Sequence, residues 1–180
     1  MAGFLGVDEL FKSRHFDREV IVRVDETYVK IRGKWVYLYR AVDSAGRTVD
    51  FRLSGKRDVG AAKAFFRKAI KSQGSAPLTI TLYGYATSHR AVRETKTGGE
   101  LPAETKVRSS KYLNNLIEQD HRGVKLRIGP MLGFKWFTTA ATVIAGIELL
   151  RRIHKGQFDL GGLRLKDRST PAVWNAVLAA

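Results

Sequence analysis

Hydrophobic and polar residues alternate between residues 20 and 53 in three runs separated by short turns. The first run is rich in β-branched residues and the second in aromatic residues, while the third sets Val49 and Phe51 between polar neighbours. An alternation of period two is typical of strands, and Gly33 and Gly46 supply turn residues between the runs. The pattern predicts an antiparallel meander with strands over 20–31, 34–42 and 47–53.

The hydrophobic period then changes to that of helices. Residues 58–72 gather apolar side chains on one face and basic residues elsewhere, with Asp58 as the N-cap and Gly74 as the stop. Further helices are predicted over 89–96, 111–128 and 135–154, and short strands over 78–82 and 105–109. The last segment, 155–180, has only weak periodicity. This order of elements predicts a mixed α/β fold.

The charge of the chain indicates a partner. There are 32 Lys and Arg residues against 17 Asp and Glu, which gives a net charge of +15 and a pI near 10.3. Such an excess repels itself in a compact fold, and a polyanion relieves the repulsion by releasing counterions when it binds. The alternative is an enzyme that is merely basic. Charge alone therefore favours nucleic acid as the partner.

Composition excludes several classes of protein. The 180 residues, 44% of them hydrophobic, suit one soluble domain with its own core. Because there is no cysteine, a disulfide framework and a thiolate metal site are excluded, which fits a reducing cytosol. The longest apolar stretch, 138–150, contains Glu148 and is shorter than the ~20 residues of a membrane helix. We therefore expect a soluble protein that does not enter the membrane.

Two acidic residues are candidates for chemistry. Asp25 lies in the middle of the first predicted strand, where burying an acid is costly unless something such as a metal ion offsets the cost. The alternative is that Asp25 or Glu26 faces solvent on an alternating strand. Glu118 lies in a predicted helix, with Lys125 two turns later on the same face. Since Arg122 is four residues away, a surface ion pair is the simpler interpretation of Glu118.

Motifs for other chemistries are missing from the sequence. The four histidines have no recognisable metal-ligand spacing, and Ser109-Ser110 lacks the context of a nucleophile elbow. The run 125–136 interleaves basic and aromatic residues, which suits contact with nucleic acid. Phe134 and Trp136 in this run are also typical of a core.

Three long stretches resemble a single protein family. Residues 25–54 resemble the opening of the catalytic domain in the insertion-sequence-six family of bacterial transposases. Residues 108–135 resemble its closing acidic motif, and residues 145–157 resemble the helix that follows. The similarity runs from Arg23 to the end of the chain. It implies a D-D-E transposase with a ribonuclease H-like fold, a mixed sheet flanked by helices, in the bacterial cytoplasm and associated with the nucleoid.

The resemblance also implies roles for particular residues. Asp25 and Glu118 correspond to the first and third catalytic acids, which in this family bind two Mg²⁺ (or Mn²⁺) ions roughly 4 Å apart. The ions activate water, and later a 3′-hydroxyl, for attack on phosphodiesters, so the implied function is strand cleavage and transfer in DNA transposition. The residues expected to contact DNA are Lys125, Arg122, Arg127 and Lys135.

One departure from the family pattern affects the chemistry. The family places its second Asp 34 intervening residues before the glutamate, and this chain has Tyr83 at that position. A phenol with an ordinary pKa of about 10 cannot replace a bridging carboxylate, and no acid lies between Ser72 and His89. We predict weakened metal binding and an impaired enzyme. The alternatives are a catalytically dead relic that only binds DNA, or an unrelated basic nucleic-acid-binding protein.

A second departure lies before the catalytic region. Residues 11–22 resemble the start of full-length family proteins, but the helix-turn-helix region expected before the first catalytic strand is missing. We therefore expect DNA binding to be non-specific and sensitive to salt. The expected organisation is an N-terminal remnant at 1–19, a catalytic domain at 20–155 and a C-terminal tail at 156–180. The resemblance further implies a homo-oligomer.

Overall fold

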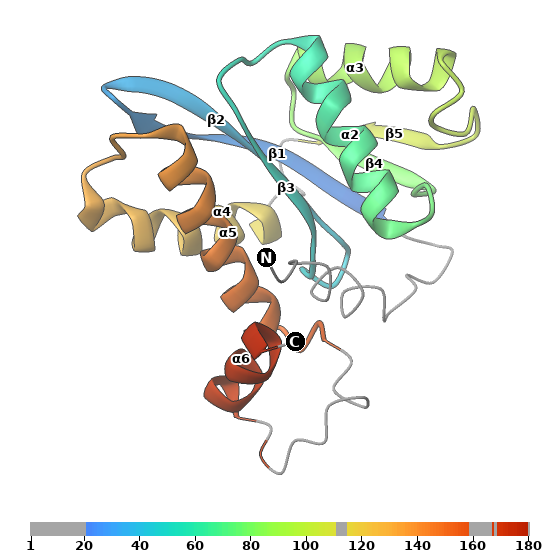
Figure 1. Cartoon of the computed structure of the whole chain (residues 1–180). Coiled ribbons are helices and arrows are strands. Elements are labelled where there is room, and N and C mark those ends of the chain that lie inside the picture. The colour runs from blue at the N-terminus through green and yellow to red at the C-terminus, as the bar shows by residue number, and fades with distance from the viewer. Residues whose placement is uncertain (1–20, 111–114, 159–166, 168, 180) are drawn as a thin grey trace.

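The fold is built on a mixed β-sheet (Figure 1). A computed structural model describes residues 21–110, 115–158, 167 and 169–179. Its strands are β1 (Ile21–Ile31), β2 (Lys34–Val42), β3 (Thr48–Ser54), β4 (Thr79–Leu82) and β5 (Lys106–Ser109). They lie in the order β3-β2-β1-β4-β5. The first three strands pair antiparallel, whereas β4 is parallel to both β1 and β5, so the predicted meander is confirmed.

The described helices follow the predicted ones with differences at their ends, and one further helix, α6, was not predicted. They are α2 (Val59–Gln73), α3 (Ala86–Thr97), α4 (Asn115–Ile128), the short 3₁₀ helix η1 (Gly129–Met131), α5 (Phe137–His154) and α6 (Thr170–Ala179). The start of the predicted helix 111–128 lies outside the described residues. None of the helices described is long and apolar enough to cross a bilayer.

Two of these differences have a local cause. Helix α3 begins at Ala86, three residues before the predicted start. Its N-cap, Tyr85, makes no side-chain capping hydrogen bond, so the sequence has no capping signal at that position. Helix α6 lies in the segment with weak periodicity. Its sequence is apolar nearly throughout, so it has no amphipathic pattern, and Val173 packs with Ile153 and Phe158 in a small cluster.

Helix α2 begins and ends where its sequence predicts. The Asp58 carboxylate accepts a hydrogen bond from the backbone N–H of Ala61 at 2.7 Å. Gly74 ends the helix in the left-handed conformation, with φ of 71°, and its N–H donates to the carbonyl of Ile70. A side chain with a Cβ rarely adopts this conformation, so glycine is the natural stop.

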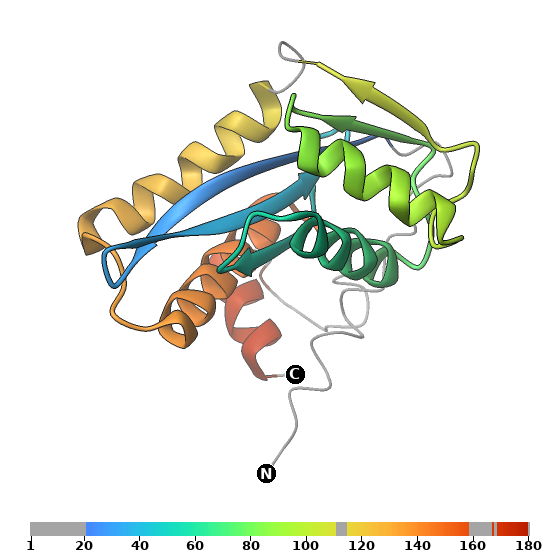
Figure 2. The same ribbon diagram turned by 90° about the horizontal axis from the view of Figure 1, so that it is seen from above.

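Helices cover both faces of the sheet (Figure 2). Helices α2 and α3 pack on the face that carries Val22 and Val24 of β1. Helices α4 and α5 pack on the opposite face, against Val29 and Ile31. Successive side chains of a strand point to opposite faces. Asp25 therefore lies on the same face as α4 and α5.

Candidate active site

Asp25 and Tyr83 lie next to one another on adjacent strands. The parallel strands β1 and β4 pair as far as Val24 and Leu82, and Asp25 and Tyr83 directly follow that pair. The Asp25 side chain is 14% exposed, and the ring of Tyr83 lies 5.6 Å from the ring of Tyr85. The residue at the next register position after Leu82, just past the end of β4, is therefore Tyr83, which carries a phenol oxygen and no carboxylate.

Helix α4 brings a histidine to Asp25. Figure 2 shows this helix running alongside β1. His121 Nε2 lies 3.4 Å from Asp25 Oδ2, while the other carboxylate oxygen accepts the backbone N–H of Glu26 at 2.8 Å. The His121 side chain is buried, and neither ring nitrogen has a hydrogen-bond partner among the described residues. Glu118 lies one helical turn earlier and is exposed.

His121 is not among the residues that the sequence predicts for the site. Because Glu118 and His121 are three residues apart on one helix, they lie on neighbouring positions of the same face. Glu-x-x-His is a known metal-ligand spacing in helical proteins. The spacing of Glu118 and His121 is therefore the sequence feature that could have pointed to His121. Which helix residue meets Asp25 depends on how α4 is rotated against β1, and spacing alone does not determine that.

The described side chains do not assemble a metal site. Among them, no three His, Cys, Asp or Glu side chains are grouped so that they could hold one ion. Mg²⁺ prefers near-octahedral coordination by oxygen. Here Asp25 faces an imidazole nitrogen, Glu118 is exposed, and Tyr83 has a phenol in place of a carboxylate. This donor set does not fit the two-ion centre that the resemblance implies.

The neighbouring acid, Glu26, cannot replace the missing carboxylate. It accepts hydrogen bonds from Arg57 Nε at 2.8 Å and from the Ser88 hydroxyl, on the sheet face opposite to Asp25. Burial lowers the pKa of Arg57, but hydrogen bonds to Glu26 and Tyr85 outweigh burial and raise it. The Glu26 side chain is only 3% exposed. The alternative that Asp25 or Glu26 faces solvent is therefore wrong.

The basic residues expected to contact DNA are all exposed, but they do not share one face. Arg122 and Lys125 lie four and seven residues after Glu118, so they continue its stripe along α4. Arg127 is nine residues after Glu118 and lies on the opposite side of the helix. Lys135 follows α4, outside any described helix. Glu118 and Arg122 form no ion pair in the described structure. The interpretation of Glu118 as one partner of a surface ion pair is therefore wrong.

A buried charge network fixes α4 against the sheet. Arg40 of β2 contacts Asp120 of α4, and its Nε lies 2.9 Å from Glu148 Oε1 of α5. Asp120 also pairs with Arg151 and with Lys155 Nζ, the latter at 2.6 Å. Burial alone would raise the pKa of Asp120, but Arg40, Lys155 and Arg151 outweigh burial and hold that pKa below its ordinary value. The network therefore joins the helix that carries Glu118 to two other elements.

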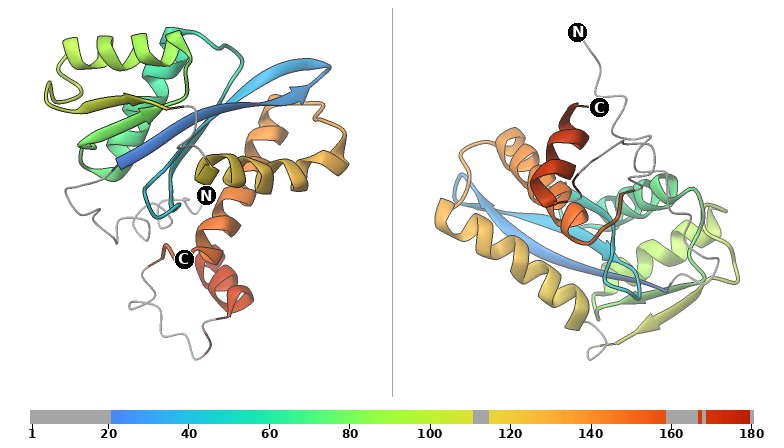
Figure 3. Two further views of the ribbon diagram at one scale, coloured as in Figure 1. Left: turned by 180° about the vertical axis from the view of Figure 1, so that it is seen from behind. Right: turned by 90° about the horizontal axis from the view of Figure 1, so that it is seen from below.

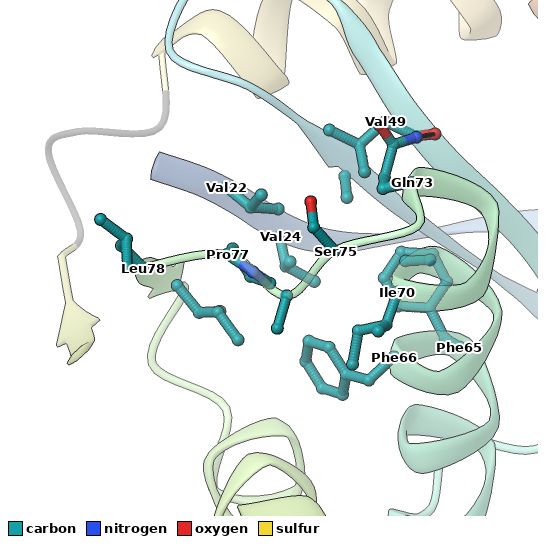
Figure 4. A pocket seen from close by; sticks show the side chains of 14 residues that line it. Val22, Val24, Val49, Phe65, Phe66, Ile70, Gln73, Ser75, Pro77 and Leu78 are labelled. Atoms are coloured by element: carbon teal, nitrogen blue, oxygen red, sulfur yellow. Dashed lines mark hydrogen bonds between the residues drawn. The ribbon is translucent and has the colours of Figure 1, made fainter. Parts of the chain in front are cut away.

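A separate apolar pocket lies between α2 and the sheet (Figure 4). It encloses about 190 Å³, and Val22, Val24, Phe66 and Ile70 are among its lining residues. No charged side chain lines it. Because Val22 and Val24 point to the face opposite Asp25, this pocket belongs to the core and not to the candidate active site.

Comparison with solved structures identifies the fold. The catalytic core domain of the HTLV-2 integrase, solved in complex with magnesium in a trimeric form, matches with a TM-score of 0.52 at 20% identity. The match covers 66% of this chain and 75% of the integrase chain. At this identity the likeness concerns the fold alone. The predicted ribonuclease H-like fold is confirmed.

Comparison with known sequences identifies the family. The chain is 38% identical over 147 residues to the transposase for insertion sequence-like element IS431mec and to the transposase for IS257 in transposon Tn4003, both from Staphylococcus aureus. The match covers 82% of this chain but only 63% of each relative. A family model described as a DDE domain matches residues 19–157. The chain therefore belongs to the DDE-domain transposases of the insertion-sequence-six family.

Proposed function

We propose that this chain is a DNA transposition domain whose strand cleavage and strand transfer are impaired at position 83. The observation that carries the proposal is the place of Tyr83, one residue beyond the last pair of β1 and β4 and beside Asp25. The integrase core that shares the fold was solved with magnesium. This chain binds the corresponding divalent cation weakly, because Tyr83, at the position of the second acid, offers a phenol oxygen in place of a carboxylate.

DNA is the proposed partner, and the charge of the chain supports it. A net charge of +15 favours a polyanion. Arg122 and Lys125, on the stripe that begins at Glu118, are placed to contact backbone phosphates near the scissile bond. Replacing either residue with alanine should reduce the salt dependence of duplex binding by about one unit of slope. The domain acts as a homo-oligomer in this proposal.

The test is metal-dependent nicking of supercoiled plasmid by the wild-type chain and by Tyr83→Asp. We expect little nicking by the wild type and clear Mg²⁺-dependent nicking by Tyr83→Asp, which Asp25→Asn should abolish. The matched control is Tyr85→Asp. It adds the same charge two residues away, at the N-cap of α3, where Asp is well tolerated, and it should not restore nicking.

The alternative function is that of a relic that binds DNA and turns nothing over. It predicts that Tyr83→Asp still binds duplex DNA but does not nick plasmid with either Mg²⁺ or Mn²⁺. Efficient nicking by the wild-type chain, equal to that of Tyr83→Asp, would contradict the impairment. Failure of both proteins to bind duplex DNA would contradict the proposed function and the alternative together.

A further inference from the structure

The connection between α4 and α5 meets the tip of the β1–β2 hairpin (Figure 3). Aromatic and basic residues are frequent in both segments. We call this surface the hairpin platform. It consists of Tyr28, Lys30, Arg32, Trp35, Lys125 and Trp136. Its three rings are unusually open to solvent, with Tyr28 53%, Trp35 56% and Trp136 58% exposed.

The backbone beneath the platform is held by hydrogen bonds. The N–H of Arg32 donates to the carbonyl of Phe134 at 2.8 Å, and the N–H of Phe134 donates to the carbonyl of Lys30 at 2.9 Å. Gly133 has φ of 104°, and a Cβ placed there would lie 3.0 Å from that same Lys30 carbonyl. The close approach of the two segments therefore requires glycine, and the platform is a preformed surface.

Two tight turns shape the backbone at the same place. Within the described residues, the non-glycine residues with positive φ are Arg32 and Leu132, with φ of 50° and 53°. Both line an open hollow of about 470 Å³ at the platform, together with Lys30 and Trp136. Both conformations have a local cause. Arg32 and Gly33 form the two-residue turn of the hairpin, in which both residues take positive φ. Leu132 is the left-handed C-cap of η1, and its N–H donates to the carbonyl of Gly129.

Each ring of the platform has a cation beside it. Arg32 lies 3.7 Å from the ring centroid of Trp136, Lys125 Nζ lies 5.2 Å from that of Tyr28, and Lys30 Nζ lies 5.9 Å from that of Trp35. Neither of the two segments that build the platform, 27–42 and 121–147, contains a single Asp or Glu. These two segments thus contribute positive charge and no acid, and the complement of the surface is an anion with flat apolar groups.

Nucleic acid whose bases are unpaired is such an anion with flat apolar groups. Phosphates satisfy the cations, and exposed bases stack on the rings, which a fully paired duplex cannot offer. Tyr, Trp and Arg also occur often in protein interfaces, but Lys is depleted there. The two lysines therefore favour a polyanion over a protein as the partner. The hollow has the volume of a small-molecule site, which suits one displaced nucleotide.

We propose that the hairpin platform binds an unpaired, single-stranded segment of DNA next to the phosphodiester held at Asp25 and Glu118. This inference rests on the proposed function, since Lys125 connects the two places. Lys125 lies on the same stripe of α4 as Glu118, about 10 Å further along the helix. A strand that enters the site passes Lys125 and reaches Tyr28 and Trp35. Its unpaired bases stack there while the flanking duplex remains paired.

The experiment measures binding without divalent metal, so catalysis does not enter it. Fluorescence anisotropy in EDTA compares labelled oligothymidylate, a blunt duplex, the same duplex with an unpaired end, and a duplex with an internal bubble. We expect oligothymidylate and the unpaired forms to bind more tightly than the blunt duplex. The last two probes distinguish a frayed end from a melted internal site.

The decisive variant is Trp35→Ala combined with Trp136→Ala. It should weaken binding of oligothymidylate about tenfold and leave the Kd for the blunt duplex unchanged. Leu78→Ala removes an exposed apolar side chain outside the platform and is the matched control. Of the three tryptophans in the chain, Trp174 lies in α6 away from the platform, so Trp174→Phe should preserve quenching of tryptophan emission by oligothymidylate.

Two results would overturn the proposal. One is equal affinity of the folded double variant and the wild type for oligothymidylate. The other is a change in oligomeric state with no change in oligothymidylate binding, which would make the platform an interface between copies of the chain. Neither depends on whether Tyr83→Asp restores nicking, so failure of this inference and failure of the proposed function are separate outcomes.

Discussion

The buried charge network allows a quantitative prediction about the stability of the fold. Arg40 has no exposed surface, and Glu148 is 1% exposed at the side chain. Two contacts join them, at 2.9 and 3.0 Å. The substitution Glu148→Gln keeps the shape of the side chain and removes its charge. Arg40 must then share Asp120 with Arg151 and Lys155, so three cations face one carboxylate.

The expected loss of stability in Glu148→Gln follows from the Arg40 charge that is left without its partner. Removing one partner of a buried ion pair costs about 3–5 kcal/mol, because a charge remains in a place that water cannot reach. Since Asp120 still contacts Arg40 and Gln can accept one hydrogen bond, the lower end applies, at about 3 kcal/mol. For a domain of this size each kcal/mol moves Tm by about 2–4 °C. We therefore expect Tm to fall by about 6–12 °C.

Circular dichroism follows both a thermal melt, which gives Tm, and urea denaturation, which gives the unfolding free energy, with the m-value checked to be unchanged. The control is Glu100→Gln. Glu100 also pairs with an arginine, Arg67, through both oxygens, but this pair lies on the surface. Exposed pairs contribute little, so the control should unfold at the wild-type midpoint. If Glu148→Gln shifts the midpoint no more than the control does, the network is not what stabilises α4 against the sheet.

Three further predictions test other parts of the molecule. In the Tyr83→Asp background, His121→Gln should reduce plasmid nicking by about 10–100-fold with little change in Tm, because His121 orients Asp25; unchanged nicking would refute that role. The pKa of Asp120 lies below its ordinary value, so its ionised form contributes stability above about pH 4 that is lost as pH falls through the folded-state pKa. Acid titration by circular dichroism should therefore show a shallower loss of stability in Asp120→Asn than in the wild type. Gly133→Ala should cost about 1–3 kcal/mol in urea denaturation, since its Cβ would lie 3.0 Å from the Lys30 carbonyl, and a neutral result would mean that the loop adjusts.

Much of the architecture could be predicted from local patterns. The alternation in β1 to β3 and the capping residues of α2 each reflect interactions within a few residues of the chain, so the sequence records them directly. The match of residues 19–157 to the family confirms what the long resembling stretches implied. Position 83 follows from the acid spacing that the family resemblance supplied, and in the structure it directly follows the last pair of β1 and β4, as Asp25 does.

By itself, then, the sequence determined the family, the order of the elements and the residue that departs from the acidic triad. Only the tertiary structure decided that His121 meets Asp25, that Arg40 is buried, and that Trp136 is exposed while Phe134 is not. Arginine is normally exposed and tryptophan normally buried. Arg40 is an exception because its acidic partners lie eighty or more residues away in the chain, and Trp136 because none of the described elements covers it. Periodicity records which face of an element is apolar, but the polar groups that meet across elements depend on rotations and distances that packing alone sets.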